Sequence, residues 1–329
     1  MARRFLDPKA DLTFKKVFGE HPDLVISLLN ALLPFKNKEE EITSIEYLTP
    51  EMVPDNPLRK FSIVDVRCKD QRGRQFIVEM QMIWSHEFMQ RVMFNSAKAY
   101  VRQLDKNEQY HLLEPVYSLN LVNEVFMKDI PDYYHYFRMV HEKHTNKVID
   151  GLHLVFVELP KFTPHNMKEK KMKVLWLRYF TEIDGYMETV PQDLLDSSEI
   201  NKAMEVVEES SYTPEQLLGY DMFWDIIRTE KTYYYSAEKK GLEKGLAKGL
   251  EKGLAQGLEK GRAEGLEKGR AEGLEKGLAE GLEKGLAEGR AEGEQIKTLE
   301  IARKMKAMGL SLADIKNATG LADESIEKL

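Results

Sequence analysis

The sequence contains a single cysteine, Cys68, so it forms no internal disulfide and offers no cysteine-based zinc site. It has no run of 18 uninterrupted apolar residues, which predicts that no segment spans a membrane. Its first residues lack the apolar run of a signal peptide, and we therefore expect a cytoplasmic protein. Positive charge is also scarce, because 48 Lys and Arg against 55 Asp and Glu give a net charge of −7. Nucleic acid would have to be contacted through local basic patches or a bound metal ion.

Apolar residues make up 42% of the chain, which is enough for a hydrophobic core. The most informative stretch is residues 63–83, IVDVRCKDQRGRQFIVEMQMI, whose two arms are rich in Val, Ile and Phe. Between the arms, residues 70–73 have the composition of a turn, so the stretch predicts a β-hairpin. If the pairing is centred near Arg72, Asp65 lies opposite Glu79 on one face of the hairpin. The other face is almost entirely apolar and is expected to pack against a core.

Two carboxylates that face each other across a hairpin repel unless a cation or a proton lies between them. Oxygen ligands on a rigid sheet suit Mg²⁺ or Mn²⁺, which keep several waters and complete their shell with substrate phosphate. Such a metal activates water and stabilises charge on a phosphoryl group. From the residues alone, the alternative is a solvated strand face on which the acids neighbour Arg67, Lys69 or Arg74.

Asp65 followed by Glu79, Met80 and Gln81 resembles the PD-(D/E)XK nuclease motif in its E-x-Q form, with Gln81 at the position of the usual lysine. The surrounding sequence is similar to that of the Rpn family of recombination-promoting nucleases and transposases. The matching segments are DLTFKKVFG (11–19), VDVRCKDQRGRQFIVEMQ (64–81), AYVRQL (99–104), LEPVYSLNLV (113–122) and HLVFVELPKF (153–162). They occur in the expected order over most of the first 240 residues.

The resemblance implies a restriction-endonuclease-like α/β fold over residues 1–240, with a mixed sheet flanked by helices. It also implies hydrolysis of DNA phosphodiesters with Mg²⁺ or Mn²⁺, linked to recombination or mobile elements. Asp65 and Glu79 would hold the metal with the backbone carbonyl of Met80, and Gln81 would orient the attacking water or a phosphate oxygen. Candidate contacts to DNA are Lys15, Lys16, Arg91, Gln103, Lys170 and Lys171, and the alternative for each is an ordinary solvated surface side chain, which is the commoner case for the first four.

A rival interpretation is a nuclease scaffold without catalytic activity that binds nucleic acid or a protein partner. The intact set of Asp65, Glu79 and Gln81 argues against it, and the acidic balance argues mildly against coating of DNA. A transposase that joins strands as well as cutting them is a third possibility, which no feature of the sequence specifically supports.

Local patterns predict the elements around the hairpin. Helices are expected at residues 11–19, 24–33, 86–104, 168–179, 199–207 and 214–235, and strands at 115–126 and 151–159. Strands before and after a long helix fit a mixed α/β sheet. The Tyr- and His-rich stretch between the last two strands is expected to be a connector, and its histidines match no standard spacing of zinc ligands.

From residue 241 to 293 glycine recurs at every fourth position, 14 times, in an eight-residue unit of the type GLEKG(L/R)AE. Each glycine costs a helix about 1 kcal/mol relative to alanine, whereas i,i+4 pairs such as Glu264 and Lys268 favour a helix. A period of four drifts by roughly 40° per repeat around a helix, so no fixed coiled-coil seam forms. We expect this stretch to be a long fraying helix or a spacer.

Residues 294–329 regain an ordinary composition and predict a small helical end. An amphipathic helix over residues 296–308 is followed by one that Ser311 caps and by a third that starts at Asp323. Short helices separated by glycine turns resemble a helix-turn-helix. Because the third helix is acidic and short, docking or homo-oligomerisation is favoured over the reading of DNA.

Overall fold

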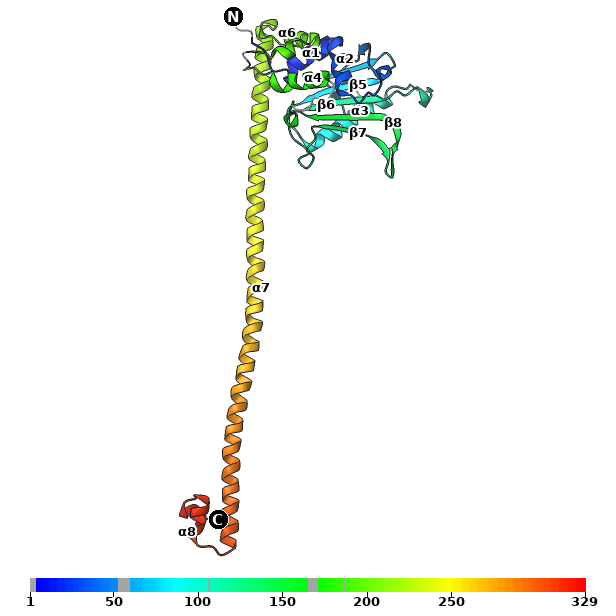
Figure 1. Ribbon diagram of the computed structural model, residues 1–329. Helices are drawn as coiled ribbons and strands as arrows, with labels where there is room; N and C mark the ends of the chain where they lie inside the picture. The colour runs from blue at the N-terminus through cyan, green and yellow to red at the C-terminus, as the bar shows by residue number, and fades with distance from the viewer. Residues whose placement is uncertain (1–3, 53–59, 106, 165–170, 186, 188) are drawn as a thin grey trace. The chain divides into compact units, whose positions relative to one another are not determined.

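The computed structural model describes residues 4–52, 60–105, 107–164, 171–185, 187 and 189–329. Contacts divide the chain into two compact units, Met1–Ser236 and Ala237–Leu329. In the first unit, a six-stranded mixed sheet carries helices on both faces (Figure 1). This agrees with the mixed α/β sheet flanked by helices that the sequence predicts.

Along the chain, the first unit contains α1 and α2, then β1 to β5, then α3, then β6 to β8, and finally α4 to α7. The helices are α1 (Asp11–Glu20), α2 (Pro22–Leu32), α3 (His86–Val101), α4 (Lys171–Glu182), α5 (Gln192–Leu195), α6 (Ser198–Val206) and the first part of α7 (Pro214–Ala307). The strands are β1 (Ile45–Tyr47), β2 (Glu51–Met52), β3 (Ser62–Ile63), β4 (Val66–Asp70), β5 (Gln75–Gln81), β6 (Val116–Val122), β7 (Tyr134–His141) and β8 (His144–Glu158).

The strands of the large sheet are ordered β1-β4-β5-β6-β8-β7. The inner strands β5, β6 and β8 are parallel, and α3 makes the crossover between β5 and β6. Strands β4 and β7 run antiparallel to their neighbours. Because parallel strands end at the same edge, the segments that follow Gln81, Val122 and Glu158 meet there.

The β4–β5 hairpin has the register that the sequence predicts. Val66 pairs with Val78 and Cys68 pairs with Phe76, so the pairing is centred on Arg72. Gly73 in the turn has a φ of +86°, a conformation that side chains disfavour. One pair further out along the same register, Asp65 would lie opposite Glu79, although β4 itself begins only at Val66.

Both faces of β5 are covered, so the alternative of a solvated strand face is wrong for Glu79. The apolar face of the hairpin packs into one large core with helices α1, α2, α4 and α6. On the other face, Ile77 of β5 packs against Ala99 of α3, and Phe88 of α3 packs against Phe156 of β8. Helix α3 therefore covers the side of β5 from which Glu79 projects, and Glu79 is buried.

The Tyr- and His-rich connector proves to be a strand, β7, which pairs with an extended β8. The prediction was wrong because the outer halves of both strands are exposed and show no alternation of apolar residues. His135 is buried against Glu158, while His141 and His144 meet at the turn of this hairpin. Among the residues that the structure describes, no group of three or more His, Cys, Asp and Glu is placed to hold a metal ion.

In the second unit the glycine repeat is helical and belongs to α7. The leucines of the repeat are exposed. Helices α8 (Leu312–Thr319) and α9 (Asp323–Glu327) follow, and the Ser311 hydroxyl caps α8 as predicted. A small core of Ala302, Ile315 and Ile326 joins the end of α7 to them. Of the helices that the structure describes, none is long and apolar enough to cross a membrane.

Candidate active site

Asp65 lies in the short segment between β3 and β4, at the point where the hairpin pairing stops. Its Oδ2 accepts a hydrogen bond of 2.8 Å from the backbone N–H of Met80 in β5. The side chain of Asp65 thus accepts from a backbone N–H of β5, beyond the point where the pairing of β4 with β5 ends. This bond fixes the carboxylate beside Glu79, the neighbour of Met80 in the chain.

Glu79 projects from β5 toward α3 and is only 5% exposed. Its Oε1 accepts a hydrogen bond of 3.3 Å from the Asn95 side-chain amide, and its Oε2 lies 3.6 Å from a guanidinium nitrogen of Arg91. Asn95 and Arg91 are one helical turn apart on α3, so this helix provides both polar contacts. Helix α3, which connects the parallel strands β5 and β6, therefore provides the side-chain contacts that hold the buried Glu79 carboxylate.

Both carboxyl groups resist ionisation. The pKa of Asp65 is raised to about 6 because the effect of burial outweighs that of the Met80 hydrogen bond, which lowers it, and the nearby Asp11 contributes to the rise. The pKa of Glu79 is raised to about 7, first by burial and second by the charge of Asp65. Arg91 lowers both pKa values but does not offset the burial. Both groups are therefore fully ionised only above about pH 7, and a bound cation would favour the doubly ionised state of the pair.

Gln81 is the last residue of β5, and both ends of its amide are engaged. Its Oε1 accepts a hydrogen bond of 2.6 Å from Arg91, and its Nε2 donates to the carbonyl of Ile83 at 2.5 Å. The structure thus brings Gln81 to the same guanidinium that faces Glu79. Asp65, Glu79 and Gln81 form one connected constellation through Met80 and Arg91.

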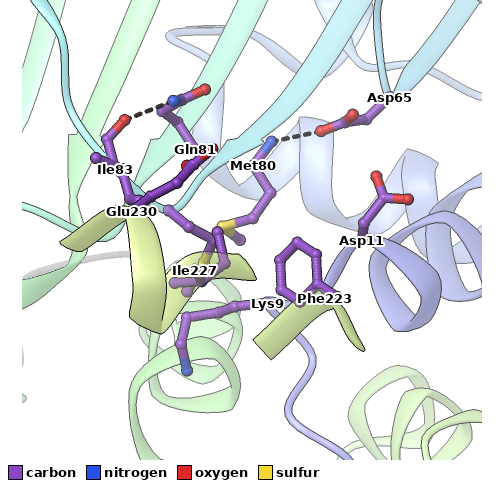
Figure 2. Close-up of a pocket in the computed structure, with 10 residues that line it drawn as sticks. Lys9, Asp11, Asp65, Met80, Gln81, Ile83, Phe223, Ile227 and Glu230 are labelled. Carbon is purple, nitrogen blue, oxygen red and sulfur yellow. Dashed lines mark hydrogen bonds between the residues drawn. The ribbon is translucent and has the colours of Figure 1, made fainter. Parts of the chain in front are cut away.

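A pocket of about 190 Å³ opens beside Asp65. Figure 2 shows the carboxylates of Asp11 and Asp65 side by side at this pocket. The first part of α7 also lines the pocket, through Phe223, Ile227 and Glu230 (Figure 2). The pocket gives Asp65 access to small molecules and is bordered by acidic groups.

The donor set suits a hard divalent cation. Carboxylate oxygens are the ligands that Mg²⁺ and Mn²⁺ prefer, and a pair of them leaves positions for water and phosphate. A buried oxygen, Oδ1 of Asn95, lies beside Glu79 and has no hydrogen-bond partner among the described residues. Such an orphaned acceptor is satisfied when a water bound to a cation donates to it. The Asp65 and Glu79 carboxylates fit the expected metal in chemistry.

The other predicted contacts to DNA separate into two groups. Lys15 is near enough to lower the pKa of Asp65, although its ammonium pairs with Asp11 at 2.6 Å. By contrast, Lys16 donates to the carbonyl of Ser211.

Of the remaining candidates, Gln103 and Lys171 make no contact with the carboxylates in the part of the chain that the structure describes. Gln103 exchanges two hydrogen bonds with the backbone of Glu114 and so holds the segment before β6. Lys171 is exposed at the beginning of α4, and Lys170 lies outside the described residues. Among the predicted contacts that lie in the described residues, Arg91 is the one that contacts the acidic pair directly.

The prediction from sequence missed Asn95 and the residues of α7 that border the pocket. Asn95 had a visible signal, because it interrupts the apolar stripe of α3 formed by Phe88, Val92 and Ala99. A polar residue on a buried helix face needs a partner, and here the partner is Glu79. Phe223 and Ile227 had no such signal, since only the packing of α7 brings them to the pocket.

With this geometry in place, comparison with known families is informative. A family described as PD-(D/E)XK nuclease family transposase matches residues 8–234. The matched region contains the whole large sheet, α3 and the pocket-lining part of α7. Searches of curated proteins and of solved structures gave no match.

Proposed function

We propose that Asp65 and Glu79 form the active site of a metal-dependent endonuclease. The premise is that the chain belongs to the PD-(D/E)XK nuclease family of transposases. Family membership implies nuclease activity linked to mobile elements and DNA as the partner. The finer proposal is hydrolysis of DNA phosphodiesters by a member of the Rpn branch. The similarity of the segments around the hairpin supports that branch.

One observation carries the proposal. Two carboxylates stand at the end of the β4–β5 ladder, the buried Glu79 and the partly buried Asp65 that lines a pocket, and desolvation keeps the pKa values of both high. Ionisable groups with strongly perturbed pKa values in a cleft are candidates for a functional site. A structural ion pair does not account for these raised pKa values, because an opposite charge lowers the pKa of a carboxyl group. The direct cationic partner of Glu79, the Arg91 guanidinium, lies 3.6 Å away.

The expected cofactor is Mg²⁺ or Mn²⁺, since nucleases of this superfamily typically use divalent metals. Bound by Asp65, Glu79 and the Met80 carbonyl, it would activate water and stabilise charge on the phosphoryl group. The contribution of the protein itself is to position the two carboxylates. The Met80 N–H orients Asp65, and Asn95 orients Glu79. Gln81 carries no charge and takes up no proton, so it acts through its hydrogen bonds.

We also propose a division of labour along the chain. Residues 1–240 would form the nuclease, residues 241–293 a spacer, and residues 294–329 a helical end for docking or homo-oligomerisation. The exposure of the repeat leucines supports a stretch that contributes no core.

Nicking of supercoiled plasmid by the purified full chain tests the proposed function. We expect nicking with Mg²⁺ or Mn²⁺, none with EDTA, and background rates for Asp65→Asn and Glu79→Gln. These substitutions keep the side-chain shape while weakening the metal ligands. Asp23→Asn is the matched control, because Asp23 is a surface carboxylate paired with Lys202 away from the pocket, and it should nick like the parent. A folded parent that does not nick with either metal would favour the inactive scaffold instead.

A further inference from the structure

Arg91 occupies an unusual position for a surface cation. Its side chain is 49% exposed, yet it reaches Glu79, whose side chain is 7% exposed. The guanidinium donates to Gln81 Oε1 at 2.6 Å and lies over the Phe88 ring at 4.8 Å. Gln81 is in turn held by the Ile83 carbonyl. Arg91 therefore bridges the buried carboxylate and the solvent, and it does so from a supported position.

We propose that Arg91 exchanges partners during the reaction: it neutralises Glu79 in the metal-free protein, and it binds a phosphate of the DNA once a divalent cation takes Glu79. This inference rests on the proposed nuclease function, and it assigns to Gln81 the role of positioning Arg91. Arg91 thus competes with the cation for Glu79 before the metal binds, and it binds the substrate phosphate afterwards.

Competition follows from the shared carboxylate. The Arg91 guanidinium faces Oε2 of Glu79, and a cation bound by Glu79 would meet that positive charge at close range. The contact of 3.6 Å is long and half exposed, so it is a weak pair that a divalent ion displaces readily. By contrast, a buried, short ion pair would resist displacement.

Transfer to phosphate follows from the geometry of the side chain. A guanidinium is planar, is always charged and matches the spacing of phosphate oxygens with paired N–H donors. Because the Arg91 side chain is half exposed, its guanidinium, which lies over the Phe88 ring, is free to turn from Glu79 toward a phosphate on the solvent side. The other cations near the acidic groups are less available, because Lys15 pairs with Asp11 and Lys16 is bonded to Ser211.

The first test measures binding of Mn²⁺ alone, without DNA. The full chain and Arg91→Gln are titrated with Mn²⁺ at about pH 8, where both carboxyls ionise, and the rise in melting temperature is followed. Removal of the competing charge should lower the Mn²⁺ concentration at half-maximal shift by about threefold. A variant that needs the same or a higher concentration overturns the competition between Arg91 and the cation.

The second test measures plasmid nicking at saturating Mn²⁺. Because the phosphate ligand is lost, Arg91→Gln should nick at least about tenfold more slowly than the parent. Tighter metal binding together with slower cleavage is the signature of partner exchange. A merely structural role would weaken both, and nicking at the parental rate would overturn the inference.

Two further variants complete the experiment. Arg91→Lys keeps a charge but has no planar fork, so both effects should be intermediate. This variant also serves if Arg91→Gln fails to fold. Arg228→Gln is the matched control, since Arg228 forms an exposed pair with Asp225 outside the acidic pocket. It should change neither quantity. If the parent itself does not nick, the proposed function fails, whereas the Mn²⁺ midpoints still decide whether Arg91 competes for Glu79.

Discussion

The backbone N–H of Met80 donates a 2.8 Å hydrogen bond to the carboxylate of Asp65. A ladder donor of β5 is thereby bonded to a side chain instead of a neighbouring strand. The carboxylate is fixed by backbone and is less free to rotate than an acid held by side chains alone. Asp65 is consequently preorganised next to Glu79, and the cost of their repulsion is built into the metal-free fold.

The first prediction concerns pH in the absence of metal. In the folded state the pKa values of Asp65 and Glu79, about 6 and about 7, exceed their ordinary values. The folded state therefore keeps these protons up to a higher pH than the unfolded state does. Stability from this pair is therefore greatest at low pH and falls as pH rises to about 7. Melting temperatures measured in EDTA should show a smaller decline over this range for Asp65→Asn and Glu79→Gln than for the parent.

Added metal should reverse this trend, since a cation binds the ionised carboxylates. The Mg²⁺-induced rise in melting temperature should be larger at about pH 8 than at about pH 5.5, with affinity changing roughly tenfold per pH unit for each proton released. Asp65→Asn should lose most of the shift. An equal response of this variant and the parent would mean that the metal binds elsewhere.

The second prediction concerns Asn95, which donates to Glu79 Oε1 from α3. Asn95→Leu keeps the approximate volume and removes the donor that favours the ionised form of Glu79. The pH midpoint of metal-dependent nicking should therefore rise by about one unit, the equivalent of one hydrogen bond to a charged group. Rates of nicking across a pH series provide the measurement.

Ser96→Ala is the control for the Asn95 variant. Ser96 is equally buried on α3, but its hydroxyl bonds only the Val92 carbonyl within the helix. Its pH midpoint should match that of the parent. If both variants shift the midpoint alike, Asn95 acts through the packing of α3 and not through its bond to Glu79.

Local chemistry made part of this structure predictable. The β4–β5 register follows from alternation in two adjacent strands and from a turn with Gly73 at positive φ. The caps of α8, Ser311 and Gly320, are likewise properties of a few neighbouring residues. In these places the sequence neighbours are also the spatial neighbours, so a pattern in the chain translates directly into structure.

The burial of Glu79 was beyond such patterns. The odd face of β5 looked polar because it carries Gln75, Glu79 and Gln81, yet α3 covers it. Which helix covers which face depends on contacts between residues far apart in the chain. The same applies to Phe223, which reaches the pocket of Asp65 from the other end of the first unit's sequence.

The third prediction concerns the tail. If residues 241–329 only tether or assemble nuclease units, a chain that ends at Lys240 should fold and nick at a rate similar to the full chain. Weaker DNA binding or a changed oligomeric state, seen by size-exclusion chromatography, is compatible with this role. Loss of nicking by the shortened, folded chain would contradict it.

A chain that ends at Thr213 is the comparison for the tail. It lacks Phe223 and Ile227, which line the pocket, and Tyr220, whose hydroxyl accepts from the Asp7 N–H at 2.9 Å. This shorter chain should be less stable and should lose nicking. If it keeps both properties, the first part of α7 is not needed to complete the active site.

The last prediction concerns Gln81, whose amide links Arg91 to the end of β5. Gln81→Ala removes this link and should lose most of the nicking activity. Gln81→Lys should keep a substantial part, because an ammonium at this position adds a positive charge near Glu79 that favours the transition state. If Gln81 works by positioning Arg91, adding Arg91→Gln to Gln81→Ala should cause little further loss. Initial nicking rates of the parent, the single variants and the double variant, each checked by circular dichroism, decide the matter. Independent, multiplying losses would show that Gln81 acts on the substrate directly, whereas matched losses would place both residues in one functional unit.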